Sequence, residues 1–428
     1  ASVGLGNIWW FPYLAAKYGG GTFLLTYLIL TLTFGFSLMI TEVALGRKAG
    51  TSAIRAFGHF SKKHTFIGYL TTIIPFIIFP YYCVIGGWVT KYALLSLQGG
   101  IHNAASDTFF TGFISKSAEP MICVLVFLIA TTVVVAGGVK GGVERVSTIM
   151  MPVLIVFLIG VSLFCITRPG AMAGVAYYLK PSLKGFGPTT ILAALGQLFY
   201  SMSLAMGIMI TFGSYMPKKA DLEKSVTQVE IFDTGVAFLA GLMIVPAVFV
   251  FSNGDSSMLA KGPSLMFVML PKVFDSMAFS GVIAAVFFIL VLLAALTSSI
   301  SLLETLVAVL MDKFHMKRGT ACITMFIVAL LLAVPSSLGF GAWSNITILG
   351  FDFLDFFDFI SNSVLMPIAA FLTCIFVGYI IKPKEIIDEV ESSGEFKRKP
   401  LFLVMVKYIA PICIVAILVF SVLEGLGF

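Results

Sequence analysis

The chain has 428 residues, of which 59% are hydrophobic and 11% are charged, and its mean hydropathy is +1.04. A water-soluble protein of this length needs far more charge to cover its surface, so the composition excludes an ordinary soluble fold and indicates an integral membrane protein. The net charge of +6 suits the inner face of a lipid bilayer, and we expect no nucleic-acid partner.

Cysteine and histidine do not indicate a chemical site. All 6 cysteines lie inside apolar runs without disulfide or metal-ligand spacing, so we interpret them as small hydrophobic residues. The 4 histidines lie in predicted loops with no nucleophile or metal arrangement around them, so we expect no enzyme activity. No signal peptide is visible, and because the chain opens inside an apolar run we expect a further N-terminal tail before Ala1.

Apolar runs that approach the length of a bilayer-spanning helix recur along the whole chain. We therefore predict an all-α integral membrane protein with eleven transmembrane helices. The runs are 1–16, 23–40, 69–90, 121–138, 146–166, 189–215, 236–251, 277–303, 321–335, 359–381 and 408–423.

The placement of basic residues predicts the orientation. Every second loop, beginning with the one after the second run, holds most of the 27 Lys and Arg residues. Cytoplasmic loops carry such an excess. We expect a multi-pass protein of the cell membrane, such as a bacterial inner membrane, with the N-terminal side cytoplasmic and the C-terminus outside.

Two of the runs contain interruptions. Val3-Gly4-Leu5-Gly6-Asn7 places two glycines in the first run, and residues 201–207, SMSLAMG, place small and polar residues in the sixth. First and sixth helices occupy corresponding positions if the fold consists of two five-helix halves. Paired breaks of this kind indicate a transporter with inverted repeats, whose half-helix ends offer N–H groups to an anion and carbonyl oxygens to cations.

Several motifs in order identify a family resemblance. They are GLGN and FPY within 4–13, GGGTF (19–23), TEVALGR (41–47), PYY and Trp within 80–88, GQLFYSMSLAMG (196–207), DTGVAFLAG (233–241) and ALTSSISLLE (295–304). Together they resemble the neurotransmitter:sodium symporter family over essentially the whole chain. The resemblance implies one transporter domain, 1–428, with inverted repeats at 1–166 and 189–381, an extra C-terminal helix at 400–428, and first and sixth helices that unwind in mid-membrane.

The resemblance also implies a substrate class. Family members that carry monoamines have an aspartate where this chain has Gly4, whereas amino-acid carriers have glycine. We therefore expect an amino acid, with its carboxylate at the backbone of Leu5 and Gly6 and at the Tyr82 hydroxyl. A hydrophobic or aromatic side chain is favoured by the wall. The substrate-binding residues implied are Ala1, Ser2, Gly4, Leu5, Gly6, Ile78, Tyr82, Tyr200, Ser201, Ser203, Met206, Ser298 and Leu302.

Two sodium ions are implied as cofactors by the same resemblance. The first sodium site corresponds to Ser2, Asn7, Ser201 and Asp233, and the second to Val3, Ala294, Thr297 and Ser298. Sodium is a hard cation that prefers oxygen ligands of this kind. Chloride-dependent relatives have a neutral residue at the position of Asp233, so we expect chloride independence.

Gate and support residues complete the predicted site. Glu42 resembles the glutamate that supports the unwound sixth helix, and we expect Glu304 to be a second support, with counter-transport of a proton as its alternative. Trp10 replaces a gate arginine whose acidic partner aligns with Asp355. We expect Trp10 to stack with Tyr81 and Tyr200, and Asp355 to be solvated or to pair with another cation such as Lys17. At the inner gate, Asp312 aligns with the family acid and has Tyr215 as its expected neighbour.

Three other functions stay open at this stage. One is a sodium-coupled carrier of an aromatic acid or amine, although Gly4 argues against an amine. The others are a channel and a ligand sensor that kept the fold. A channel would need a continuous polar stripe, whereas the polar residues of the apolar runs gather at one depth.

Overall fold

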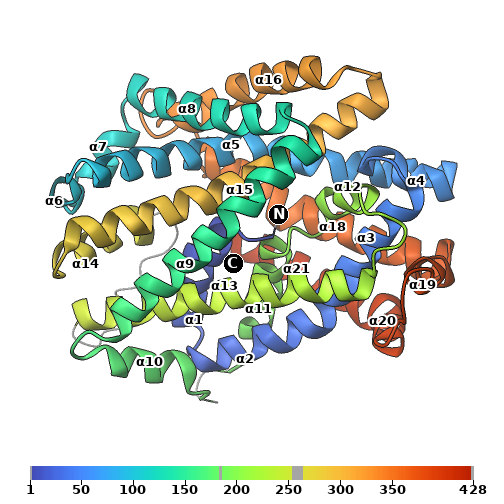
Figure 1. The fold of residues 1–428 in the computed structure, drawn as a ribbon, viewed down its shortest axis with the longest axis horizontal. Helices are drawn as coiled ribbons and strands as arrows, with labels where there is room; N and C mark the ends of the chain where they lie inside the picture. The colour runs from blue at the N-terminus through green and yellow to red at the C-terminus, as the bar shows by residue number, and fades with distance from the viewer. Residues whose placement is uncertain (1, 183–185, 253–263, 426–428) are drawn as a thin grey trace.

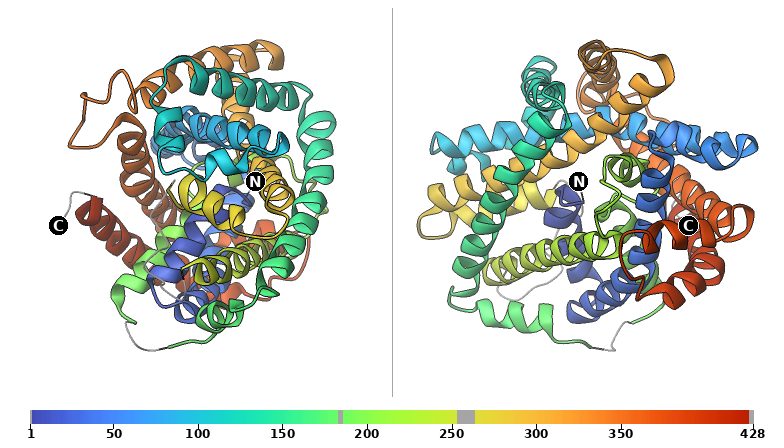
Figure 2. Two further views of the ribbon diagram at one scale, coloured as in Figure 1. Left: turned by 90° about the vertical axis from the view of Figure 1, so that its left-hand side faces the viewer. Right: turned by 45° about the vertical axis from the view of Figure 1, so that its right-hand side comes forward.

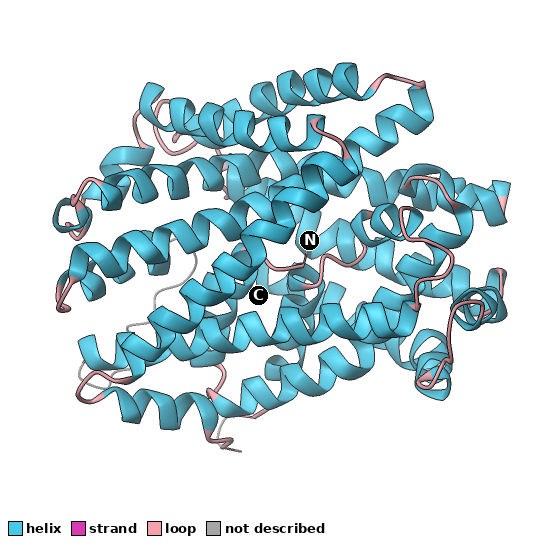
Figure 3. Ribbon diagram, viewed as in Figure 1, coloured by secondary structure: helices cyan, strands magenta, loops and turns pink. Residues whose placement is uncertain are grey.

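The structure is a computed structural model that describes residues 2–182, 186–252 and 264–425. The described residues form helices and loops, with no strand beyond one isolated bridge between Ile348 and Phe351 (Figure 3). The predicted all-α class is therefore confirmed.

The long helical segments follow the predicted runs and extend past several of their ends. Nine of them, within the described residues, are long and apolar enough to cross a membrane. In chain order these segments are α2, η2 and α3 (Gly21–Leu30, Thr31–Gly35, Phe36–Ala49), η3 and α5 (Lys62–His64, Thr65–Leu97), α8 (Ala118–Ala136), η4 and α9 (Val139–Glu144, Arg145–Ile166), α13 (Leu222–Phe251), α15 (Ser280–Phe314), α16 (Arg318–Leu338), α17, η7, α18 and η8 (Phe353–Asp358, Phe359–Leu365, Met366–Ile375, Phe376–Ile380), and α20, η9 and α21 (Lys399–Val404, Met405–Ile409, Ala410–Gly425).

The other two predicted spans are the interrupted ones. One is η1 and α1 (Gly6–Trp10, Phe11–Lys17), which follows the non-helical residues 2–4, and the other is α11 and α12 (Pro188–Ser201, Ile208–Ser214). Within the described residues, neither contains a continuous helix long enough to cross a membrane.

Short helices lie at the two ends of the bundle. They are α4 (Ala53–Phe60), α6 (Ile101–Ala104), α7 (Phe109–Ile114), α10 (Ala171–Leu179), η6 and α14 (Leu265–Met269, Leu270–Asp275) and α19 (Lys384–Glu391). In Figure 1, α6, α7, α10 and α14 gather at the left, and α4, α19 and α20 at the right, with the long helices running between them. Figure 2 (left) looks onto the first of these ends. The charge pattern predicts that this first end is extracellular.

The outer surface is suited to lipid. Large apolar side chains are exposed along the long helices, as at Val133, Ile149 and Ile412, which are 66%, 63% and 72% exposed. A soluble protein would bury most of such side chains, whereas hydrocarbon solvates them. All six cysteines are free, and only Cys413 is partly exposed.

Close backbone contacts fix α12 against α3. A Cβ atom at Gly46 would lie 1.9 Å from the Ile210 carbonyl oxygen, and one at Gly213 would lie 2.3 Å from that of Val43. Only glycine permits such an approach, as in other membrane helix pairs built on small residues. The helix that follows the second interruption therefore has a fixed position.

Candidate functional site

The sixth predicted span is broken where the sequence predicts it. Helix α11 ends at Ser201 and α12 begins at Ile208. Between them, Ser203, Ala205 and Gly207 have φ values of 54°, 61° and 71°. Two of these are not glycine, so the segment needs outside support to stay in the left-handed region.

Glu42 supplies that support. Its Oε1 atom accepts a hydrogen bond from the Ala205 N–H at 2.6 Å, and the side chain is 3% exposed. An unpaired backbone N–H inside a membrane is costly, so this contact stabilises the open segment. The geometry agrees with the supporting role expected for Glu42.

The glycines of the first interruption lie where side chains cannot fit. A Cβ atom at Gly4 would lie 2.2 Å from Ser298 Oγ, and one at Gly6 would lie 2.5 Å from Tyr200 Cδ1. These distances are far inside van der Waals contact. The first segment can therefore approach α15 and α11 only where it has no side chain, and both positions require glycine for this reason.

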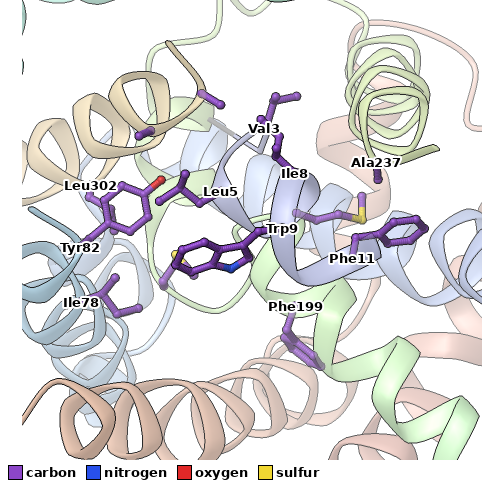
Figure 4. Close-up of a cluster of buried hydrophobic side chains, with 14 of the residues drawn as sticks. Val3, Leu5, Ile8, Trp9, Phe11, Ile78, Tyr82, Phe199, Ala237 and Leu302 are labelled. Carbon is purple, nitrogen blue, oxygen red and sulfur yellow. The ribbon is translucent and has the colours of Figure 1, made fainter. Parts of the chain in front are cut away.

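A cavity of about 30 Å³ lies between the two interruptions. Every predicted substrate-binding residue in the described part of the chain lines it, whereas Ala1 lies outside the described residues. Figure 4 shows the Tyr82 hydroxyl directed toward Leu5, with Ile78 nearby on the same helix. This buried hydroxyl makes no well-directed hydrogen bond within the described residues, so it is available to a ligand.

The residues predicted for the first sodium site form one buried polar cluster. Asn7 Nδ2 donates to Ser201 Oγ at 2.8 Å and to Asp233 Oδ1 at 2.9 Å, and Ser201 Oγ donates to Asp233 Oδ2 at 2.9 Å. Asp233 is fully buried, and its other partner is the Tyr27 hydroxyl at 3.3 Å. No ion pair among the described residues involves Asp233, so the carboxylate suits a cation as counter-charge.

The residues predicted for the second sodium site also converge. Thr297 Oγ1 and Ser298 Oγ each lie 3.1 Å from the Val3 carbonyl oxygen, and Thr297 Oγ1 also lies 2.9 Å from the Ala294 carbonyl oxygen, so its one proton can be donated to either carbonyl. Two carbonyls and two hydroxyls thus meet where the first segment contacts α15. Such a neutral oxygen set fits a hard monovalent cation better than a transition metal.

The outer gate differs from the expectation. The Trp10 ring packs on Tyr13, with centroids 5.3 Å apart, and the described rings show no stacking of Trp10 on Tyr81 or Tyr200. Residues three apart share one face of a helix, so the nearer aromatic is its own neighbour along the chain. The expected three-ring closure is therefore wrong for this conformation.

The charged residues of the outer side also have other partners. Lys17 Nζ lies 3.9 Å from Glu424 Oε1, and its predicted pairing with Asp355 is not formed. Asp355 is exposed at the start of α17. Tyr81 instead donates a hydrogen bond to Asp358, an acid three residues further on.

At the opposite end, the two predicted inner residues are bound to different groups. The Ser52 N–H donates to Asp312 Oδ2 at 2.5 Å, whereas the Tyr215 hydroxyl donates to Glu304 Oε1 at 2.7 Å. Glu304 also binds Arg318, and among the described residues it makes no hydrogen bond to the backbone of 202–207. Glu304 thus contacts the second half of the broken span through Tyr215, and its role as a second support stays a prediction.

Three residues around the site were missed from the sequence. Ile208 lines the cavity at the start of α12, Tyr27 contacts Asp233, and Gln197 Nε2 donates to the Gly6 carbonyl at 2.9 Å. Gln197 lies inside the quoted motif 196–207, and its spacing of four residues from Ser201 is a signal that could have found it.

Comparison with known proteins agrees with this geometry. The family model described as "Sodium:neurotransmitter symporter family" matches residues 1–112 and 109–425. Sodium-dependent transporters of Haemophilus influenzae and Bacillus subtilis are each 34% identical, over 98% and 97% of this chain and 94% and 93% of their own length. The crystal structure of MhsT in complex with L-phenylalanine superposes with a TM-score of 0.88 at 36% identity, covering 98% of this chain and 96% of MhsT.

A more distant relative differs in its stated ion dependence. The human sodium- and chloride-dependent GABA transporter 2 is 24% identical over 99% of this chain and 77% of its own length.

The fold and the paired interruptions define a multi-pass membrane transporter, not an enzyme. The chain belongs to the sodium:neurotransmitter symporter family and is a sodium-dependent transporter.

Proposed function

We propose that this chain imports a hydrophobic or aromatic L-amino acid by sodium-coupled alternating access. The observation that carries the proposal is the buried cavity between two open backbone segments, with an oxygen cluster on either side. The described part of the chain places no basic or acidic side chain in the cavity lining, so a zwitterion would bring its own balanced charges.

The two ends of the substrate would meet different groups. Its carboxylate would accept from the N–H groups around Leu5 and Gly6, at the start of η1, and from the Tyr82 hydroxyl. Its ammonium would donate to carbonyl oxygens of the segment after Ser201. Ile78, Met206 and Ile208 would surround an apolar side chain, and methionine adapts to different shapes. The phenylalanine in the MhsT structure supports an aromatic occupant.

Two sodium ions would bind beside the substrate. Asn7, Ser201 and Asp233 would hold one of them, and Val3, Ala294 and Thr297, together with Ser298, would hold the other. The Asp233 carboxylate would supply the negative charge that a bound chloride supplies beside the first sodium ion in chloride-dependent carriers. Transport would therefore not need chloride. A sodium ion adds positive charge next to a zwitterion, and it stabilises whichever conformation has the oxygen clusters assembled.

The membrane potential would then drive uptake. Each charge moved inward gains about 2.3 kcal/mol per 100 mV, so two sodium ions with a zwitterion would gain roughly twice that figure. The chain would lie in the cell membrane, as in a bacterial inner membrane, with its N-terminal side in the cytoplasm.

Uptake into proteoliposomes tests the proposal. With sodium outside and an inside-negative potential, we expect accumulation of radiolabelled L-phenylalanine or L-leucine, and none when potassium replaces sodium. Gly6→Ala, which would press against Tyr200, is the inactive comparison. Binding without accumulation would favour the ligand sensor, and uptake of aromatic acids alone would favour the non-amino-acid carrier.

A further inference from the structure

The segment between the last two predicted spans folds back onto other helices as a strap. The strap consists of residues 382–399, including α19, and lies at the end of the molecule that the charge pattern predicts to be cytoplasmic (Figure 1). Arg47 of α3 is 2% exposed, and its Nε atom donates to Glu389 Oε1 of α19 at 2.7 Å. Lys218 Nζ, in the loop between α12 and α13, donates to the same oxygen at 2.9 Å. One carboxylate of the strap therefore joins α3 to that loop.

Arg398 fastens the far end of the strap. Its Nη2 atom donates to Glu230 Oε2 of α13 at 2.8 Å, and its guanidinium carbon lies 3.3 Å from the centre of the Phe36 ring of α3. Glu223 of α13 accepts from the backbone N–H groups of Lys397 and Arg398, at 2.6 and 3.1 Å. Hydrogen bonds to carboxylates are roughly twice as strong as neutral ones, so the strap is held firmly at both ends.

The polar partners of the strap all belong to one group of elements. Among the described residues, the hydrogen bonds and ion pairs that leave the strap go to η2 and α3, to α13, and to the loop before α13. In the same part of the chain, none goes to α5, α8, α9, α15 or α16. A movement of α3 and α13 relative to those five helices would therefore carry the strap along without breaking a polar contact.

The strap is connected to the broken sixth span through α3. Arg47 directly follows Gly46, whose close approach to Ile210 fixes α12 against α3. Helix α12 begins beside the cavity, at Ile208. Arg47 Nη1 also donates to the Ala220 carbonyl oxygen, in the loop after α12, at 2.7 Å. The second half of the broken span, α3 and the strap thus form one connected body.

Irregular backbone lies on both sides of α19. Lys382 has a φ of 68°, a left-handed value that is uncommon for a residue other than glycine. π-Helical turns precede and follow the strap, in η8 and η9, and such turns are frequent at functional sites. Helices bend at π-helical turns, so these are the positions at which the last two spans can change direction relative to the strap.

We propose that the strap is a coupling device, which stays bound to α3 and α13 in every conformation and carries their movement to the last two spans. Arg47 and Glu389 are its central positioning residues. The inference rests on the alternating-access function proposed above. A contact that persists in both conformations does not change their relative populations, so its loss should slow their exchange and leave equilibrium sodium binding unchanged.

Cross-linking distinguishes a strap that stays bound from a latch that must open. Lys48 of α3 and Glu385 of α19 form a partly exposed ion pair at 2.7 Å, so cysteines at these two positions can be joined by a short bis-maleimide. Cys413, which is partly exposed, is replaced by serine throughout. We expect the cross-linked protein to keep most of its sodium-driven L-phenylalanine uptake, and the cross-linking yield to be the same in sodium and in potassium. Uptake that stops on cross-linking, or a yield that changes with sodium, would overturn the proposal.

Breaking the contact tests the coupling itself. Glu389→Gln removes the charge that holds Arg47 and Lys218, and we expect the maximal uptake rate per folded protein to fall about tenfold, as for lost hydrogen bonds to a charged group. The half-saturating sodium concentration of equilibrium binding should not change, whereas a general defect in folding would raise it. The covalent link between α3 and α19 should then restore the rate.

Glu391→Gln is the matched control on the same helix, because its partner Lys399 belongs to the strap and the rate should not change. Arg398→Lys is a second variant if Glu389→Gln does not fold, since it keeps the charge but loses the two-pronged contact with Glu230. Wild-type rates in these strap variants, or a rate that the cross-link does not restore, would refute the coupling. If the wild-type chain takes up no amino acid with sodium, the proposed function fails, and the cross-linking yields still decide whether the strap stays bound.

Discussion

Arg318 binds Glu304 through two parallel hydrogen bonds, from Nη1 to Oε2 at 2.7 Å and from Nη2 to Oε1 at 2.9 Å. The Tyr215 hydroxyl donates to the same carboxylate, whose side chain is fully buried. Three segments that are separate in the chain, the end of α12, the middle of α15 and the start of α16, therefore meet at one acid. The half-helix below the cavity is thus tied to two long helices at its far end from the site.

Glu304→Gln should destabilise the protein strongly. It leaves the Arg318 guanidinium without its counter-charge, which costs about 3 kcal/mol at the low end of the range for buried pairs, because Arg318 is 21% exposed. The melting temperature in detergent measures this. Glu391→Gln breaks a surface pair with Lys399 and is the control, with a loss of about 0–1 kcal/mol. Equal, small shifts in both variants would contradict the structural role of Glu304.

Gly46→Ala should disrupt the packing of α3 on α12. The new methyl group would lie 1.9 Å from the Ile210 carbonyl oxygen, so the two helices must separate. We expect a clear loss of thermal stability and of sodium-dependent binding. Gly160→Ala is the matched control in α9, since its Cβ would meet open space and alanine is the better helix former by about 1 kcal/mol. A Gly46→Ala protein as stable as this control would refute the close contact.

Much of the fold could be predicted because hydropathy and basic residues are local signals. A long apolar run such as 146–166 predicts a helix, and the structure has α9 there. The interruptions could be predicted because Gly4 and Gly6 stand two residues apart in an apolar run, and because small and polar residues cluster at 201–207. The motifs then selected lining residues that the structure brings together from α5, α11 and α15.

The side-chain partners could not be predicted, because they depend on tertiary packing. Trp10 turns to Tyr13, and Glu304 to Arg318, although both pairs are near in sequence. The hydrogen bond between Tyr81 and Asp358 could not be predicted, because the family resemblance indicated Asp355, one turn earlier. A shift of three residues along one helix keeps roughly the same face, so the pattern alone does not say which acid reaches Tyr81.

Chloride replacement tests the role assigned to Asp233. With gluconate in place of chloride, we expect unchanged uptake in the wild type, because the fixed carboxylate lies against Asn7 and Ser201. Asp233→Ser removes that charge and should make uptake depend on chloride, because a bound anion would then have to supply it. A wild type that loses uptake in gluconate would refute this assignment.

Removing hydroxyls from α15 should weaken sodium binding. Thr297→Ala and Ser298→Ala each delete an oxygen that contacts the Val3 carbonyl, so we expect the half-saturating sodium concentration to rise about tenfold or more. Ser299→Ala is the control, since that hydroxyl faces Thr131 of α8. Sodium dependence that changes in Ser299→Ala but not in Thr297→Ala would place the ion elsewhere.

Equilibrium binding of radiolabelled L-phenylalanine to the purified protein tests the central claim most directly. We predict saturable binding in sodium, competition by other hydrophobic amino acids, and no binding in potassium. We also predict its loss in Gly6→Ala, because the methyl group would push Tyr200 into the cavity. Binding that is equally strong in potassium, or that survives Gly6→Ala, would contradict a shared amino-acid and sodium site between the two interrupted helices.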